Sequence, residues 1–372
     1  MKVVHVIVGL NVGGAEMMLK KIIMHTPSKE NVEHIVVSLT DVGEVGEDLK
    51  KQGVKIYALN ARKSIGIFMV CFKLMSVLKK ESPDLVQTWM YHADLLGGLA
   101  ARLLRVPVVW NIRTTDIKKS SGQMTVVIRW LCSVLSKIIP HKIICVAKSA
   151  EQVHVRVGYS EKKIQVIGNG FPIPAIGDAT RKLAGYKYFN ASDFIIGSVG
   201  RYSAAKNHML LLRAASIVVK TVPYAKFIMI GRDVDENNLI LTRAIDSLNL
   251  KDNVILLGPQ SNVQAHMRYF DLFCLHSRTE GFPNVLGEAM ALGIPSITTD
   301  VGDARIVIGD SELVIPPDDE MELAQKIIKM ASLSSTRLVE IGINGRNRIV
   351  ELFSIEKIVS QYLALYQEVL RS

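Results

Sequence analysis

Short runs of β-branched and other apolar residues alternate along the chain with longer segments in which apolar residues recur every three or four positions. The short runs lack a regular alternation of apolar and polar side chains, which is typical of parallel strands covered by helices on both faces. The first half contains six such runs, at residues 2–9, 33–40, 54–60, 84–89, 107–113 and 142–147. Amphipathic helices are predicted between them, for example over residues 14–26 and 93–104.

The same rhythm restarts after "VIGNGFPIP" (166–174), a stretch rich in Gly, Asn and Pro that is typical of a linker. Six more strands are predicted after it, at residues 194–200, 226–231, 253–258, 272–277, 295–300 and 312–316. The final segment, "SIEKIVSQYLALYQEVLRS", has a helical pattern and is expected to pack back across the domain boundary. Alternating strands and helices indicate an α/β fold with two facing Rossmann-like domains.

We therefore predict an N-terminal domain over residues 1–168, a C-terminal domain over residues 169–354, and a helix over residues 355–372 that returns to the first domain. The length of 372 residues agrees with two domains at about 150 residues each. Ligands of such sheets bind at the carboxyl ends of the strands, so the cleft between the two domains is the expected site.

Composition narrows the class of protein. A hydrophobic content of 49% with 22% charged residues is typical of a folded globular chain. The four cysteines form no CxxC pair, which argues against a zinc site or a disulfide framework and fits a reducing cytosol. We see no signal-peptide pattern, and charged residues interrupt the apolar stretches at 64–80 and 124–146. We expect a cytoplasmic protein, with peripheral contact to the inner face of a membrane left open.

The charge is unevenly distributed. Residues 1–168 hold 24 of the 45 Lys and Arg residues but only 13 of the 35 Asp and Glu residues. This asymmetry indicates an anionic partner for the first half, with scattered surface lysines as the alternative. The stretch "SIGIFMVCFKLMSVLKK" (64–80) is the candidate for contact with anionic lipid. Aromatic residues make up only 6% of the chain and do not interleave with the basic ones, so we predict no nucleic-acid partner.

The first motif is "HSRTEGFPNVLGEAMALGIPSI" (276–297), at a predicted strand-to-helix junction. The chain turns through Gly-Phe-Pro and enters a helix near Asn284, whose free N–H groups suit a phosphate. Glu280 stands just before the turn, where its carboxylate can accept hydrogen bonds from sugar hydroxyls. Glu288 lies about one turn into the helix and can accept from ribose hydroxyls. The alternative for Glu288 is that it only complements the helix dipole.

The second motif is "GSVGRYSAAKNHMLLLRAA" (197–215), in which Arg201 and Lys206 occupy a short loop between a predicted strand and a helix. Two cations at the carboxyl end of a strand can neutralise a departing diphosphate in place of a metal ion. Surface Arg and Lys residues are common, so this motif alone is a weak signal.

The third motif is "VGLNVGGAE" (8–16), a Gly-rich turn between the first strand and the first helix. It does not match the G-x-G-x-x-G fingerprint, which argues against a dinucleotide enzyme. Gly13 and Gly14 either let the backbone approach a ligand or simply form a tight turn.

Taken together, "GLNVGGAE", "GRYSAAK" and "EGFPNVLGE" resemble the GT-B-fold glycosyltransferases of family 4 (glycosyl transferases group 1), which are retaining enzymes that use nucleotide sugars. The resemblance covers essentially the whole chain. It implies that Arg201 and Lys206 bind the donor diphosphate and that Glu288 binds the ribose. It also implies that Glu280 holds the sugar and that Gly13 and Gly14 approach the donor or acceptor. The sugar would further contact the backbone of Gly281, Phe282, Pro283 and Asn284.

The chain departs from the family pattern on the acceptor side. Many relatives carry a His after the fifth N-terminal strand, where this chain has Arg113. Arginine cannot act as a base, so Arg113 is expected to orient a group or to stabilise charge. His92, at the end of a predicted strand, is the other candidate, with a capping or packing role as its alternative. The candidate catalytic residues are Arg201, Lys206, Glu280, His92 and Arg113.

The resemblance implies no cofactor and no metal ion. The sequence "DVD", with Asp233 and Asp235, matches the Asp-x-Asp of metal-dependent single-domain glycosyltransferases, but we interpret it as a solvated loop. The expected activity is transfer of a hexose or N-acetylhexosamine from a UDP-sugar to a glycan or lipid-linked glycan in bacterial surface polysaccharide synthesis. A nucleotide-sugar epimerase of the same doubled layout is the alternative.

Overall fold

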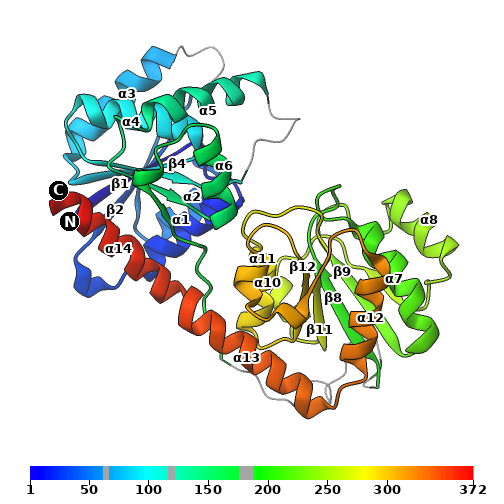
Figure 1. Cartoon of the computed structure of the whole chain (residues 1–372). Coiled ribbons are helices and arrows are strands. Elements are labelled where there is room, and N and C mark those ends of the chain that lie inside the picture. Colours follow the sequence, from blue (N-terminus) through cyan, green and yellow to red (C-terminus); the bar gives the residue numbers. More distant parts are fainter. Residues whose placement is uncertain (62–66, 116–121, 176–187, 189, 191, 372) are drawn as a thin grey trace. The chain divides into compact units, whose positions relative to one another are not determined.

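The computed structural model describes residues 1–61, 67–115, 122–175, 188, 190 and 192–371. The chain divides into two compact units, described here separately. The N-terminal unit comprises Met1–Gly170 and Ile355–Ser372, and the C-terminal unit comprises Phe171–Ser354. Each unit is a parallel sheet with helices on both faces (Figure 1), as the sequence predicts.

The N-terminal sheet has seven strands in the order β3-β2-β1-β4-β5-β6-β7, all paired in parallel. The strands are β1 Lys2–Ile7, β2 Glu33–Ser38, β3 Lys55–Ala58, β4 Leu85–Trp89, β5 Val108–Ile112, β6 Lys142–Cys145 and β7 Ile164–Val166. The order reverses between β1 and β4, and the carboxyl ends of strands next to such a reversal are where ligands of open α/β sheets bind.

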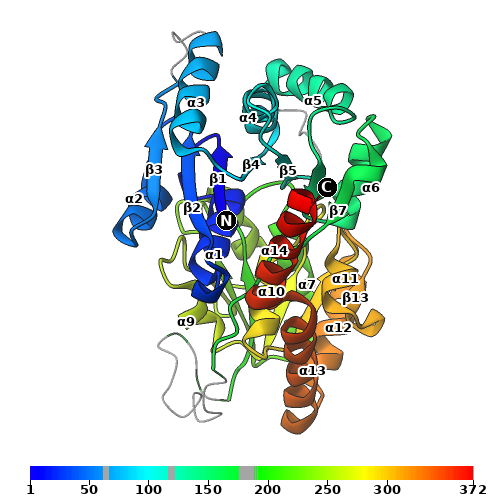
Figure 2. The same ribbon diagram turned by 90° about the vertical axis from the view of Figure 1, so that its left-hand side faces the viewer.

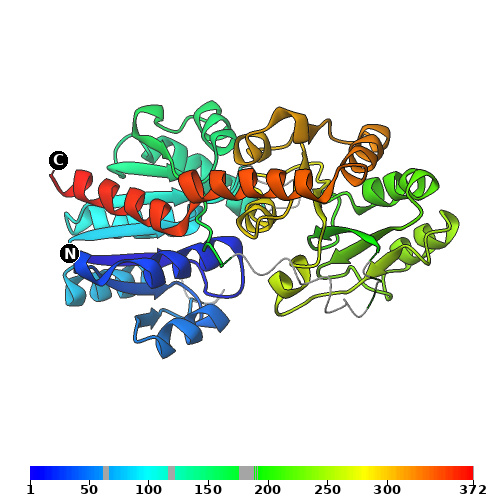
Figure 3. The ribbon, with the colours of Figure 1, turned by 90° about the horizontal axis from the view of Figure 1, so that it is seen from below.

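Helices cover both faces of this sheet. They are α1 Gly14–His25, α2 Gly43–Lys51, α3 Ile67–Glu81, α4 Tyr91–Leu103, α5 Gln123–Leu135, α6 Lys148–Arg156 and α14 Ile355–Arg371, with short 3₁₀ turns at Ser28–Glu30 and Glu161–Lys163. Helices α1 and α14 pack side by side on one face, as Figures 2 and 3 show. Helix α4 packs between α3 and α5.

The C-terminal helix is part of the N-terminal core. Tyr362 and Tyr366 of α14 are fully buried among side chains of β1, β4 and α1. The hydroxyl of Tyr362 also accepts a hydrogen bond from the Asn111 amide at 3.1 Å. The prediction that the last helix packs back on the first domain is therefore confirmed.

The C-terminal sheet has six parallel strands in the order β10-β9-β8-β11-β12-β13. The strands are β8 Phe194–Val199, β9 Ala225–Ile230, β10 Val254–Leu256, β11 Leu272–Leu275, β12 Ser296–Thr299 and β13 Val314–Ile315. The helices are α7 His208–Thr221, α8 Leu239–Ser247, α9 Val263–Met267, α10 Asn284–Ala291, α11 Ala304–Ile308, α12 Glu320–Ala331 and α13 Ser335–Phe353, with a 3₁₀ turn at Ser311–Leu313. Separate apolar cores fill the two faces of the sheet.

All twelve predicted strands are present, most of them shorter than predicted because their last one or two residues belong to the following loops. Strand β7 was not predicted, since it has only three residues and runs into the Gly-rich linker. The predicted lipid-facing stretch becomes α3, while its residues 64–66 lie outside the described part of the chain. Within the described ranges, no helix is both long enough and apolar enough to cross a membrane.

Candidate functional site

The predicted diphosphate loop follows β8 in the C-terminal unit. It covers residues 200–207 and is anchored at its start, where the Gly200 N–H donates to the Ile230 carbonyl at 2.8 Å. Near its end, Asn207 adopts a left-handed backbone with φ of 50°, which a short polar residue tolerates. Lys206 is half-buried just before this bend, while Arg201 is exposed at the opposite end of the loop.

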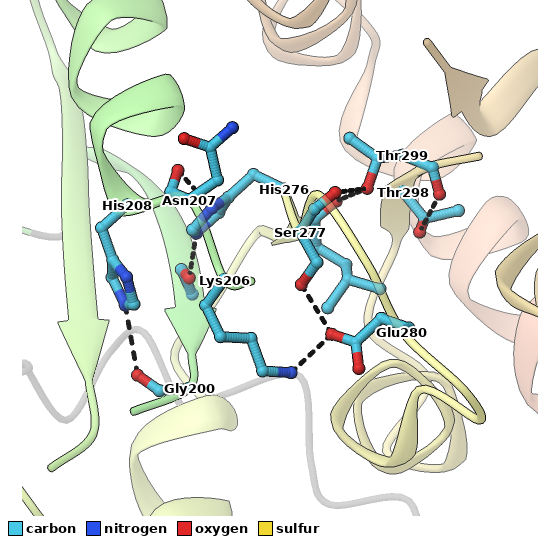
Figure 4. A network of polar contacts seen from close by, with 11 residues as sticks. Gly200, Lys206, Asn207, His208, His276, Ser277, Glu280, Thr298 and Thr299 are labelled. Atoms are coloured by element: carbon cyan, nitrogen blue, oxygen red, sulfur yellow. Dashed lines mark hydrogen bonds and ion pairs between the residues drawn. The ribbon is translucent and has the colours of Figure 1, made fainter. Parts of the chain in front are cut away.

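Lys206 and Glu280 form an ion pair with 2.5 Å between Nζ and Oε1 (Figure 4). The Ser277 hydroxyl donates to the same carboxylate oxygen at 2.6 Å. Both charged side chains are mostly shielded from solvent, 22% and 12% exposed. The structure therefore brings together two of the predicted catalytic residues, which lie 74 positions apart in the sequence.

The loops that carry these two side chains are bonded to each other. The Arg278 N–H donates to the Ala205 carbonyl at 2.7 Å. On the far side, Gly302 has φ of +54° and packs so tightly that a Cβ there would lie 2.5 Å from the carbonyl oxygens of Glu280 and Gly281. Only glycine suits that position. The backbone around Glu280 is thus fixed from both sides.

Two buried histidines hydrogen-bond to backbone carbonyls of the diphosphate loop (Figure 4). His276 Nδ1 lies 3.2 Å from the Asn207 carbonyl and its Nε2 lies 2.6 Å from the Ser198 hydroxyl. A neutral ring satisfies both, donating to the carbonyl and accepting from the hydroxyl. His208 Nε2 donates to the Gly200 carbonyl at 3.2 Å. Burial lowers the pKa of His276 to about 3 and the pKa of His208 to about 4.

Acid is therefore expected to destabilise the C-terminal unit. Both folded-state pKa values lie below the usual histidine value of about 6.5. The two neutral rings therefore contribute their full share to the free energy of unfolding above about pH 6.5, and this contribution is lost as the pH falls toward about 4. At about pH 5 each imidazole should cost about 2 kcal/mol. Hydrogen exchange of the β8 and β11 amides at about pH 7 and pH 5 measures the change, after correction for the intrinsic pH dependence of exchange.

The variant His276→Asn provides the control for this prediction. Its amide can donate to the Asn207 carbonyl as Nδ1 of His276 does, and it does not titrate. The variant should lose about 2 kcal/mol less than the wild type between the two pH values. Equal losses in the two proteins would contradict the assignment of a neutral His276.

The predicted helix begins at Asn284, as expected, and α10 then runs to Ala291. Pro283 is the N-cap residue and has no side-chain acceptor, so it leaves the helix start without a side-chain cap. Phe282 stacks on the buried ring of Phe171, with ring centroids 6.1 Å apart. Packing of this ring holds the Gly-Phe-Pro turn in place. Glu288 lies one turn into the helix and is half-buried.

In the N-terminal unit, four predicted residues lie at the carboxyl ends of neighbouring strands. Gly13 and Gly14 are the N-cap and first residue of α1, which follows β1. His92 is the second residue of α4, which follows β4, and burial lowers its pKa. Arg113 directly follows β5. Since β1, β4 and β5 are adjacent, these residues share one edge of the sheet.

Arg113 is held by a set of polar contacts. Its guanidinium donates to the Tyr362 hydroxyl at 3.0 Å and to the side-chain oxygens of Asn111 and Asn169. It also lies over the Trp89 ring, 5.9 Å from the ring centroid. Burial lowers its pKa from the ordinary arginine value. A guanidinium fixed in this way can orient a partner or stabilise negative charge.

The Asp-x-Asp sequence lies in the loop after β9. Asp233 is exposed and has φ of +61°, and Asp235 accepts a hydrogen bond from the Asn237 N–H at 2.9 Å. Both residues form local turn contacts, in agreement with the solvated-loop interpretation.

Sequence reasoning missed four polar residues and one glycine that shape the site. They are Ser198, Asn207, His276, Ser277 and Gly302. A usable signal was present, because Ser198, His276 and Ser277 lie at the carboxyl ends of otherwise apolar strands, where α/β sheets place ligand-binding groups. The predicted strands include all three residues.

Two protein-family models match the chain, one in each half. The "Glycosyltransferase Family 4" model matches residues 12–173. The "Glycosyl transferases group 1" model matches residues 186–348. Together they cover the strands of both sheets except β1, and every site residue predicted from the sequence.

Relatives of similar length support this match. The capsular polysaccharide biosynthesis glycosyltransferase CapM of Staphylococcus aureus is 27% identical over 357 residues, 92% of each chain. The Escherichia coli UDP-Gal:alpha-D-GlcNAc-diphosphoundecaprenol alpha-1,3-galactosyltransferase is 28% identical over 306 residues, 79% of this chain and 77% of that one. Anabaena Alr3699/HepE, solved in complex with UDP, has the same fold, with a TM-score of 0.85 at 21% identity over 99% of this chain and 100% of that chain. The chain therefore belongs to the GT-B glycosyltransferases of group 1 and family 4.

Proposed function

We propose that this glycosyltransferase moves a hexose or N-acetylhexosamine from a UDP-sugar to a glycan or lipid-linked glycan, with retention at the anomeric carbon and without a metal ion. The observation that carries the proposal is the shielded Lys206–Glu280 pair beside the start of α10. It joins a cation suited to a diphosphate with a carboxylate suited to sugar hydroxyls. The E. coli relative is named for a UDP-galactose donor and a diphosphoundecaprenol-linked acceptor, and HepE was solved with UDP, which favours this choice of substrates.

In this proposal the donor diphosphate lies between the diphosphate loop and the first turn of α10. Lys206, Arg201 and the N–H groups of that turn face the phosphate oxygens. These groups are fixed before the reaction, so they stabilise the charge of the leaving diphosphate without reorganising. Glu288 accepts hydrogen bonds from the ribose.

Donor binding must exchange the partner of Lys206. Without donor, the Lys206 ammonium is neutralised by Glu280. The donor diphosphate replaces Glu280 as the counter-ion, which frees a carboxylate oxygen for a sugar hydroxyl. Ser277 continues to donate to Glu280 and keeps it oriented toward the sugar.

Retention follows from attack on the face of the sugar that the diphosphate leaves. The bond from the anomeric carbon to the diphosphate oxygen breaks, and a bond to the acceptor hydroxyl oxygen forms on the same face. The acceptor proton passes to an oxygen of the leaving diphosphate. Arg113 orients the acceptor or stabilises negative charge near it, and His92, Gly13 and Gly14 line the same sheet edge. We assign the enzyme to the cytoplasmic side of bacterial surface polysaccharide synthesis, in peripheral contact with an anionic membrane.

A donor screen that follows released nucleotide, with and without a bacterial membrane lipid extract, tests this function. The proposal predicts UDP release that depends on one UDP-sugar, increases with lipid extract and persists in EDTA. An epimerase would instead convert the UDP-sugar with no acceptor present and release no UDP. The family models and relatives are glycosyltransferases, which favours transfer over epimerisation.

A further inference from the structure

Helices α3, α4 and α5 form a layer on the N-terminal sheet (Figure 1). Each of them exposes large apolar side chains. Phe68 and Phe72 lie one turn apart on α3 and are 87% and 75% exposed. Trp130 of α5 is 62% exposed. The other exposed apolar residues of this surface are Met69, Leu99, Leu103, Met124, Val126, Val127 and Val134. Isolated exposed apolar residues are ordinary, but ten large ones on three neighbouring helices indicate an interaction site.

The charges on these helices have one sign at the surface. The three helices contain two acidic residues, Glu81 and Asp94, and both are buried. Glu81 pairs with Lys55 at 2.7 Å, and Asp94 accepts a hydrogen bond from Thr88. The exposed charged residues are the basic Lys73, Lys79, Lys80 and Arg102. This surface is therefore complementary to a partner that is both apolar and anionic.

We infer that the outer surface of α3, α4 and α5, here called the α3–α5 face, docks on an anionic lipid bilayer. Its aromatic rings enter the boundary between headgroups and acyl chains, and its lysines contact the lipid phosphates. A second copy of the chain fits less well, since a two-fold contact through this face would set its basic residues against each other.

The topology gives this docking a consequence for the acceptor side. Helix α4 begins at Tyr91, at the sheet edge that also carries Gly13, His92 and Arg113. In a parallel sheet the helices that follow β3, β4 and β5 all start at that edge. Docking through the α3–α5 face brings the edge close to the lipid surface. That this position gives the sheet edge access to its acceptor rests on the proposed lipid-linked acceptor, while the docking itself does not.

The chain contains its own probe for this inference. Of its three tryptophans, Trp89 and Trp110 are fully buried and Trp130 lies on the proposed face. Vesicles of phosphatidylglycerol and phosphatidylcholine should shift the emission of Trp130 to shorter wavelength, and brominated lipid should quench it. Pure phosphatidylcholine vesicles, or added salt, should reduce binding severalfold. The variant Trp130→Phe should remove the emission change.

Matched variants distinguish binding through this face from nonspecific adsorption of the protein to vesicles. Phe68→Ser with Phe72→Ser should weaken vesicle binding about tenfold or more, since two aromatic side chains no longer enter the interface. The control is Leu239→Ser with Ile240→Ser on α8, which removes two side chains of comparable exposure and should leave binding unchanged. Vesicle binding is followed by co-sedimentation in both pairs.

Two outcomes would overturn the inference. The first is equal vesicle binding by both variant pairs. The second is a shift in Trp130 emission that occurs without vesicles, depends on protein concentration and accompanies a dimer in sedimentation velocity. The proposed function fails separately. If vesicle binding behaves as expected but no UDP-sugar is consumed, the docking stands and the assigned reaction is wrong. If the α3 variant still releases UDP with a water-soluble acceptor but no longer prefers a lipid-linked one, both stand.

Discussion

The variant Lys206→Ala is expected to turn over UDP-sugar at least a hundredfold more slowly than the wild type. Removing one fixed donor from the position where charge develops costs about 3 kcal/mol in the transition state. Lys206 is mostly shielded from solvent, so water cannot fully replace its ammonium. The loss should appear in kcat as well as in kcat/KM, because the charge of the diphosphate increases as the bond breaks.

Controls make this result specific. Lys220→Ala removes an exposed lysine from the last turn of α7 and should retain wild-type turnover. Arg201→Ala should also lose about a hundredfold if both cations face the diphosphate. Glu280→Ala should reduce turnover less in the Lys206→Ala variant than in the wild type, since the two side chains contact each other. Wild-type turnover in both Lys206→Ala and Arg201→Ala would show that the site is assigned wrongly.

The variant Gly287→Ala should lower the free energy of unfolding of the C-terminal unit by about 2 kcal/mol. A Cβ at Gly287 would lie 2.2 Å from Cζ of Phe171, far inside van der Waals contact. The Phe171 ring is fully buried and has Phe282 stacked on it, so it cannot move without displacing the Gly-Phe-Pro turn. The gain in helix propensity of about 1 kcal/mol does not offset this strain.

Calorimetry measures this effect, and Gly345→Ala is the matched control. Gly345 lies in α13, which packs against α10, and its added Cβ would meet Met290 at an ordinary 3.6 Å. That variant should therefore be as stable as the wild type or up to about 1 kcal/mol more stable. Gly287→Ala should also raise KM for the donor, because the start of α10 moves. An unchanged melting temperature and KM would contradict the tight packing that we describe.

The fold was accessible from the sequence because both sheets are covered on two faces. Strands such as Leu272–Leu275 are then unbroken apolar runs, and the linker has its own composition. The order of the strands could not be predicted in the same way. Nothing in the sequence shows that β8 lies beside β11, yet this pairing is what brings Lys206 to Glu280. The motifs predicted the two residues but not their ion pair.

Contacts between distant segments account for the rest. Arg113 is fixed by Tyr362, 249 positions away, through the return of α14 to the first sheet. His276 was not predicted as a site residue, because "LFCLHS" is a mostly apolar run and the sequence does not show where the strand ends within it. The α3–α5 face was only partly predicted. The α3 stretch was identified from its composition, but the exposure of Trp130 depends on which side of α5 packs on the sheet.

Titration of the wild-type protein with UDP by isothermal calorimetry, in buffer containing EDTA, tests the central claim most directly. Fixed cations and a helix start are proposed to bind the diphosphate, so UDP should bind as tightly with the chelator as without it. Lys206→Ala should bind at least tenfold more weakly, and Lys220→Ala should match the wild type. Absence of UDP binding, or binding that EDTA abolishes, would contradict the account.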